Sequence, residues 1–340
     1  MLSHNICAPY TLQVIEKPSS LYNTHHKTDC LCVEIGGKRI IAAYISQNPT
    51  IEDLKNTKIW EFDSRPWFTQ LPQLFTNDSS PLAFLFQMPH SSISVSIFGP
   101  LYDSEGLIDV ANHHIPRYVK DDCLKVVDSN FSMHTDTLCW SKGCLELQKI
   151  KNQMPDSSLP DSPFLVIILK GGVGVALVEP KTDVTKEKIT AIELPYTGCN
   201  FPKLQKVCES QGQEFTKFSI HDALGNRFFY WALQTRDFKE EDVTPYIPLY
   251  NERFKEFALE IKEHIESLFD MPNLKVYVGG ERCVFLTEPI PNVTYFNIQS
   301  FKDDQLSPDI IQLLGASKLF DSSQTITTTF PSYDVISSQR

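Results

Sequence analysis

Two short glycine-rich segments carry the residue types that bind phosphate groups in proteins. They read Glu34-Ile35-Gly36-Gly37-Lys38 and Lys170-Gly171-Gly172-Val173-Gly174. Closely spaced glycines let the backbone turn with positive φ and direct successive N–H groups into one concavity, which can hold an anion. A plain β-hairpin with a glycine turn explains either segment when it is taken alone. Because the same design occurs twice, we expect the two segments to face each other across a cleft and to hold one nucleotide.

Apolar runs on both sides of each glycine segment predict the strands that position it. Residues 29–35 and 39–45 surround the first segment, and residues 164–169 and 173–178 surround the second. An apolar run that breaks at glycines and then resumes is typical of two buried strands joined by a tight turn. Each glycine segment is therefore expected at the turn of a β-hairpin.

Further short segments share polar or glycine residues at the end of an apolar strand or within a helical pattern. They are Ser94–Pro100, Ala111–Ile115, Leu124–Phe131, Glu193–Tyr196, Phe218–Leu224, Leu274–Gly280 and Leu313–Ser317. Together with the two glycine segments, their order and spacing resemble bacterial-type glucokinase, a family within the superfamily of sugar kinases, heat-shock ATPases and actin. The resemblance runs along most of the chain.

The resemblance implies an α/β protein with the two-lobed, actin-like ATPase (ribonuclease H-like) fold, in which mixed sheets are flanked by helices and a cleft separates the lobes. Apolar residues at helical spacing also predict a long helix over residues 251–269, buried on one side. The expected division of the chain is an N-terminal extension at 1–26, a small lobe at 27–128 plus 304–321, a large lobe at 129–303, and a flexible, Ser- and Thr-rich tail at 322–340.

The same resemblance implies a nucleotide site and a sugar site. The nucleotide site would consist of Glu34, Gly36, Gly37, Lys38, Lys170, Gly171, Gly172, Gly174, Gly279 and Gly280. Glu34 would also assist Mg²⁺ indirectly, and ATP and Mg²⁺ would be the cofactors of an active enzyme, whereas an inactive protein would need none. The sugar would contact Asn112, Glu193, Tyr196 and His221.

Several residues depart from the family pattern where catalysis is concerned. The catalytic Asp of the family falls on Asn130 when the segments are aligned on Phe131, and on Ser129 when they are aligned on the strand; neither side chain can accept the proton of a sugar hydroxyl at neutral pH. Asp128 is the nearest substitute base, but a slip of one residue in a strand points a side chain to the opposite face. Lys170 and Gly171 replace the Gly and Thr of the family's phosphate loop. Phosphoryl transfer is therefore expected to be impaired.

The sugar site departs from the family in a similar way. Tyr196 replaces a His and His221 replaces a Glu, which changes the donors and acceptors that recognise a particular hexose. Either residue also has a structural explanation. Tyr196 would be a core residue with its hydroxyl satisfied, and His221 an ordinary residue at a helix N-terminus, next to Ser219 as N-cap.

Three functional hypotheses follow. The favoured one is a glucokinase-like protein, related to the reaction of ATP and hexose to ADP and hexose 6-phosphate, that has lost most or all phosphoryl transfer and retains sugar or nucleotide binding. The first alternative is an active, glycolytic, ATP-dependent hexose kinase that uses Asp128 as its base. The second alternative is a protein-interaction scaffold without a small ligand.

Composition narrows the class of partner. The chain has 340 residues with a formal net charge of -11, which repels nucleic acids and anionic membranes. No apolar stretch approaches the length that spans a bilayer. The nine cysteines show no repeating spacing, which indicates reduced, buried thiols. We therefore expect a soluble cytoplasmic protein whose partners are a hexose and a nucleotide, and the family resemblance adds a homodimer as an assembly to test.

Overall fold

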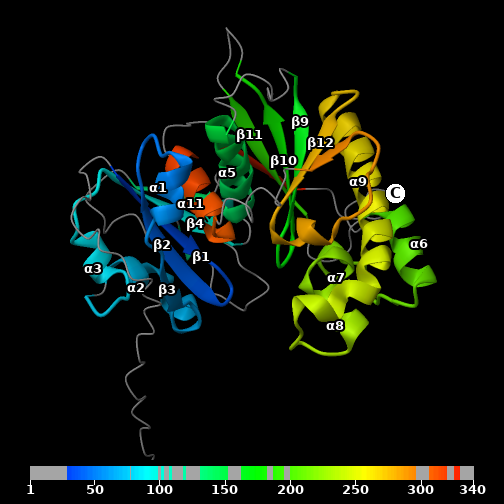
Figure 1. Ribbon diagram of the computed structural model, residues 1–340, viewed down its shortest axis with the longest axis horizontal. Coiled ribbons are helices and arrows are strands. Elements are labelled where there is room, and N and C mark those ends of the chain that lie inside the picture. The colour runs from blue at the N-terminus through cyan, green and yellow to red at the C-terminus, as the bar shows by residue number, and fades with distance from the viewer. Residues whose placement is uncertain are drawn as a thin grey trace, which may run out of the picture.

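The chain folds around two mixed β-sheets separated by a pair of helices (Figure 1). The structure is a computed structural model, and it describes residues 29–76, 78–98, 101–102, 107–108, 118–119, 131–151, 162–181, 187–194, 200–295, 306–319 and 325–329. Among these residues no helix is both long and apolar enough to cross a bilayer.

The first sheet has the strand order β3-β2-β1-β4-β8. Its strands are β1 (Cys30–Ile35), β2 (Arg39–Ile45), β3 (Trp60–Asp63), β4 (Ser92–Ile97) and β8 (Phe131–Thr135). β1 pairs antiparallel with β2 across the first glycine turn and parallel with β4, which pairs parallel with β8. The first predicted hairpin is thus confirmed.

The second sheet has the order β13-β12-β9-β10-β11-β14. Its strands are β9 (Phe164–Leu169), β10 (Val173–Glu179), β11 (Lys188–Glu193), β12 (Lys275–Gly279), β13 (Val293–Tyr295) and β14 (Thr325–Thr329). β9 and β10 pair antiparallel across the second glycine turn, which confirms the second predicted hairpin. β14 differs from the predicted flexible tail, because it pairs parallel with β11 at the sheet edge.

A middle layer of two helices fills the space between the sheets (Figure 1). It consists of α5 (Asp136–Lys151) and α11 (Pro308–Leu319). The helices cross so closely that a Cβ at Gly315 would overlap the backbone of Cys139 and of Gly143. One continuous apolar core joins this layer to the inner faces of both sheets.

Short helices flank the first sheet. η1 (Arg65–Gln70), α2 (Leu71–Thr76) and α3 (Ala83–Phe86) lie on its outer side, whereas α1 (Ile51–Asn56) packs Leu54 into the core around α5 and α11. Thr50 and Asp53 form a capping box that fixes the start of α1, while α2 and α3 supply buried apolar residues to the outer core. A small separate sheet contains β5 (Leu101–Tyr102), β6 (Leu107–Ile108) and β7 (Tyr118–Val119).

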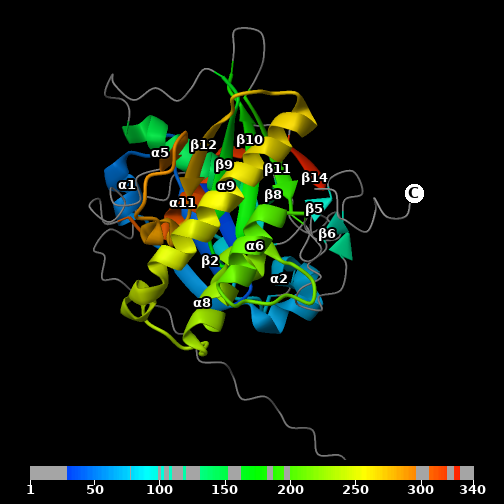
Figure 2. The same cartoon turned by 90° about the vertical axis from the view of Figure 1, so that its right-hand side faces the viewer.

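The outer face of the second sheet is covered by the predicted long helix, α9, which Figure 2 shows crossing in front of the strands. α9 (Ile247–Phe269) begins four residues earlier than predicted, because Pro248 fits the first turn of a helix. The remaining helices of this layer are α6 (Pro202–Ser210), α7 (Ile220–Leu224), α8 (Asn226–Leu233), η3 (Glu240–Tyr246) and η4 (Glu281–Phe285).

Candidate active site

The carboxyl ends of the parallel strands carry the residues that the sequence singled out. In the first sheet β1, β4 and β8 run parallel and end at Ile35, Ile97 and Thr135. In the second sheet β9 and β12 run parallel and end at Leu169 and Gly279. Ligands of open α/β sheets bind beyond the carboxyl ends of the strands. This edge of the molecule is therefore the candidate site.

The first glycine turn closes tightly on itself. The amide of Gly36 donates to the carbonyl of Arg39 at 2.9 Å, and Lys38 lies exposed at the turn. Glu34 precedes the turn and is buried, with an exposed fraction of 5%. The turn thus places one buried carboxylate, rather than an exposed one, behind Gly36 and Gly37.

The second glycine turn uses its amides within the protein. The Lys170 amide donates to the Gly172 carbonyl at 3.0 Å, as in a tight hairpin turn. The Val173 amide donates to Nδ1 of His221 at 3.1 Å. A phosphate nest requires such amides to point at the anion. The Val173 N–H of the predicted phosphate loop is therefore already hydrogen-bonded to His221.

The Lys170 side chain joins the two hairpins. Its ammonium donates to Oε1 of Glu34 at 2.7 Å and to Oε1 of Gln312 at 2.5 Å. The same ammonium lies 5.3 Å from the ring centre of Trp140, within reach of a cation–π interaction. The two glycine turns therefore meet at one site, as predicted, and Gln312 of α11 is a member of that site that sequence reasoning missed.

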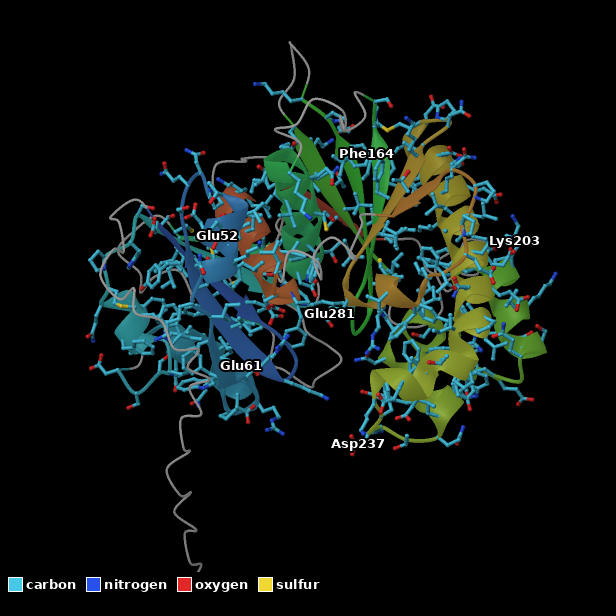
Figure 3. The ribbon with its side chains drawn as sticks, viewed as in Figure 1. Glu52, Glu61, Phe164, Lys203, Asp237 and Glu281 are labelled. Carbon is cyan, nitrogen blue, oxygen red and sulfur yellow. The ribbon has the colours of Figure 1, made fainter. Side chains whose placement is uncertain are left out.

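Charges at this site shift one another's protonation. Burial raises the pKa of the Glu34 carboxyl, and the Lys170 ammonium opposes that shift. Burial acts to lower the pKa of Lys170, but Glu34 and then Asp136 outweigh it and the pKa lies above its ordinary value. The charge of Glu281 adds to this effect, and Figure 3 shows Glu281 on the side of the second sheet that faces the first. The ammonium therefore stays charged in a surrounding of carboxyl groups.

Asp136 is a carboxylate at this edge that the sequence analysis did not select. It follows the last residue of β8 and is the first residue of α5, whose start is fixed by Thr135 Oγ1 accepting from the Leu138 amide at 3.4 Å. Gly174 of the second hairpin lies directly against Thr137, so Asp136 is adjacent to that hairpin. Burial raises the pKa of Asp136, against the effect of Lys170.

Asp136 lies a few residues further along the chain than the predicted catalytic position. Leu124–Phe131 was predicted to be the strand that ends at that position, which led to Asn130 and Asp128. Both residues lie outside the described part of the chain. The strand that pairs with β4 and leads into α5 begins at Phe131 and ends at Thr135. The usable signal was Thr135 as a helix N-cap directly before an acidic residue.

The predicted sugar ligands are placed only in part. Asn112 and Tyr196 lie outside the described residues. Glu193 ends β11, and continuing the β10–β11 register sets it opposite Gly174, at the same edge as the two hairpins. His221 is in the first turn of α7 behind Ser219, whose side chain caps that helix. Its ring packs on Gly172, and burial lowers its pKa to about 4.

The predicted Gly279-Gly280 turn lies beside the second hairpin. Gly280 has a φ of 100°, and a Cβ there would overlap the backbone of Leu169 at the end of β9. Arg282, two residues later, donates to the side-chain oxygen of Asn226. The backbone N–H of Asn226 in turn donates to the Gly171 carbonyl at 3.0 Å. The glycine requirement at Gly280 thus comes from a close approach between two strands of the site.

The carboxylate predicted to assist Mg²⁺ is paired with a lysine. Among the described residues no cluster of three or more His, Cys, Asp or Glu side chains is arranged to hold one. Lys170 already occupies Oε1 of Glu34, the residue predicted to assist Mg²⁺. An ammonium at this point competes with a cation for the same carboxylate.

Comparisons with known proteins agree with the two-sheet architecture. No protein-family model matches the sequence, and no curated protein sequence matches it significantly. The structure of glucokinase from Balamuthia mandrillaris in complex with glucose matches with a TM-score of 0.51 and 10% identity, over 86% of this chain and 93% of that chain. The structure of a glucokinase from an Antarctic psychrotroph matches with a TM-score of 0.52 and 13% identity, over 87% and 99%. This chain therefore has the glucokinase fold that the sequence predicted.

Proposed function

We propose that this chain is a sugar kinase-like protein that binds a hexose in the cleft between its two glycine hairpins and in which phosphoryl transfer is suppressed. The observation that carries the proposal is the Lys170 ammonium, bonded at once to Glu34 and Gln312 between the two turns. A nucleotide bound in the predicted way would set its phosphates at this point. The protein's own cation already satisfies the carboxylate there.

The second hairpin supports the same proposal. Catalysis of phosphoryl transfer depends almost entirely on positioning and on groups that stabilise the charge of the phosphates. Here the Val173 amide is bonded to His221, and burial keeps His221 neutral at pH 7 because it lowers the pKa to about 4. The loop therefore offers a transferring phosphate fewer donors than a phosphate nest would.

The position of Glu193, a predicted sugar ligand, supports the proposed hexose binding. Glu193 stands at the end of β11 opposite Gly174, and the matched glucokinase structure from Balamuthia mandrillaris is a complex with glucose. Asn112 and Tyr196 remain proposed ligands. We also propose a cytoplasmic location and retain the homodimer as an assembly to be measured by light scattering.

The test uses the full-length chain and a panel of hexoses. We expect at least one hexose to raise the unfolding temperature in a dose-dependent manner, since a ligand that binds only the folded state stabilises it. A coupled assay with ATP and Mg²⁺ should give no hexose-dependent ADP above background. Turnover of about 1–100 per second, the range of working kinases, would contradict the proposed suppression. Absence of any hexose effect would instead favour the interaction scaffold.

A second candidate, an active ATP-dependent hexose kinase, is favoured by one observation. Asp136 lies at the carboxyl end of β8 beside the second hairpin, and burial raises its pKa, as suits a general base. We propose Asp136 as the base of such an enzyme, since the strand that leads into α5 ends directly before it.

The second candidate makes its own prediction. If hexose-dependent ADP formation is found, Asp136→Asn should lower kcat by about 10²–10⁴-fold, the usual contribution of a positioned general base. Asp128→Asn serves as the matched control and should leave kcat within about twofold. A large loss with Asp128→Asn and none with Asp136→Asn would return the base to the position first predicted from the sequence.

A further inference from the structure

A chain of buried side chains crosses from the first sheet to the second at the candidate site. Ser96 of β4 accepts from Gln312 Nε2 at 2.6 Å, Gln312 Oε1 accepts from Lys170 at 2.5 Å, and Lys170 donates to Glu34 of β1 at 2.7 Å. Ser96 and Gln312 are fully buried, and the side chains of Lys170 and Glu34 are 19% and 7% exposed. Of these four residues only Lys170 belongs to the second hairpin, so its side-chain bonds to Glu34 and Gln312 join that hairpin to β1 and α11.

Separating this contact is unfavourable because both charges are buried. If the contact between Lys170 and Glu34 breaks while both side chains stay buried, each is left as a buried charge without compensation. Such a separation is strongly unfavourable. Trp140 of α5 covers the Lys170 ammonium from another side. Oε2 of Glu34 is buried and has no hydrogen-bond partner among the described residues, so its carboxylate depends on Lys170 for compensation.

A second ion pair fastens the first hairpin to the same helix. Arg39, the first residue of β2, donates to Asp309 of α11 at 2.6 Å. Asp309 and Gln312 are three residues apart, which places them on one face of the helix. The first hairpin is therefore held to α11 by Arg39, and the second hairpin is held to α11 and to β1 by Lys170.

We propose that Lys170 is a latch that keeps the two glycine hairpins together when no ligand is bound. The cleft is then closed by the protein's own ion pair, and a ligand that enters between the hairpins must first break the contact between Lys170 and Glu34. This role concerns the resting state of the molecule and holds whether or not the chain transfers phosphate.

Amide hydrogen exchange on the full-length, ligand-free chain tests the latch. Lys170→Met and Glu34→Gln each remove one charge while keeping most of the side-chain volume. We expect exchange of the hydrogen-bonded turn amides, those of Gly36, Lys170 and Val173, to become about tenfold faster or more in either variant, because local opening breaks the bonds that protect them. Exchange within α9 should stay at the wild-type rate. Unchanged exchange in both turns would overturn the proposal.

A matched control is available on the far side of the molecule. Lys203 pairs with Glu263 at 2.9 Å, both side chains are more than half exposed, and Figure 3 shows Lys203 on the side away from the first sheet. Lys203→Met removes the same charge from an exposed pair and should leave both turns unchanged. Faster exchange of the turns in this control would mean that any loss of a lysine loosens the molecule, which also overturns the proposal.

Two further measurements keep the test decisive. If Lys170→Met does not fold, the unmodified chain can be measured alone, and the amides of Gly36, Lys170 and Val173 should exchange as slowly as the centres of β1 and β9 without any ligand. Rapid exchange of both turns would overturn the latch. Hexose binding and ADP formation are measured separately, so failure of the latch and failure of the proposed function give different results.

Discussion

His221 is a buried residue whose protonation should affect stability. The folded chain holds its pKa at about 4 through burial, whereas an exposed histidine has a pKa near 6.5. Between these values the unfolded chain binds a proton that the folded chain does not, so the free energy of unfolding falls as the pH falls from about 6.5 to about 4. The full effect is at most about 3.5 kcal/mol, because the shift is about 2.5 pKa units and one unit corresponds to about 1.4 kcal/mol.

Denaturant unfolding at several pH values checks this prediction. His221→Asn keeps an acceptor for the Val173 amide but cannot titrate, so its stability should fall less steeply between pH 6.5 and 4 than that of the wild type. His221→Leu removes the acceptor as well and should be less stable than His221→Asn at every pH, with the same shallow slope. Equal slopes in His221→Asn and the wild type would show that another group carries the acid sensitivity.

Residue chemistry explains which parts of the site could be predicted. Both glycine hairpins and the departure at Lys170 were evident, because strand-turn-strand patterns and substitutions are local properties. The partners of Lys170 were not, since Glu34 and Gln312 lie 136 and 142 residues away from it along the chain. Asp136 was missed because Asn130-Phe131 resembles the family motif, and a strand boundary cannot be fixed from such a dipeptide.

The crossing of α5 and α11 is the element contact most sensitive to side-chain size. A Cβ at Gly315 would meet the backbone of Cys139 and Gly143, neither of which can move as a flexible side chain could. We expect Gly315→Ala to lower the free energy of unfolding by about 1–3 kcal/mol through overpacking, although alanine is the better helix former. Denaturant unfolding measures this change.

A control for this prediction lies two residues away on the same helix. Ser317 is partly exposed, and its hydroxyl bonds within its own helix, at the Leu314 carbonyl, so Ser317→Ala should change stability by about 0.5 kcal/mol or less. Stabilisation by Gly315→Ala would mean that the two helices separate readily and that helix propensity decides the outcome.

β14 shows that amino-acid composition alone does not decide whether a Ser- and Thr-rich segment is a strand or a loose tail. The Ser- and Thr-rich stretch after residue 322 was predicted to be a loose tail, yet Thr325–Thr329 forms β14 beside β11. Threonine is β-branched and suits a strand, so its polarity and its strand propensity point in opposite directions. Only the presence of a partner strand, a property of the whole fold, decides between them.

At the scale of the whole molecule, the two sheets should unfold together. The core around α5 and α11 includes apolar residues from the inner faces of both sheets, so the inner face of either sheet loses part of its packing when the other sheet unfolds. We expect a single transition in scanning calorimetry, with equal calorimetric and van't Hoff enthalpies, as for a two-state protein. Two separate transitions would show that each sheet, with its own helices, is an independent folding unit.

The position of α11 also has a consequence for how the chain folds during synthesis. The strands β1, β2 and β4 are complete by Ile97, but the helix that covers their inner face begins only at Pro308. At about 5–20 residues per second, the roughly 200 residues in between take on the order of 10–40 seconds to leave the ribosome. Throughout that interval Cys32, Ile41 and Ala43 lack the helix they pack on, so the nascent chain presents a long-lived apolar surface that chaperones recognise.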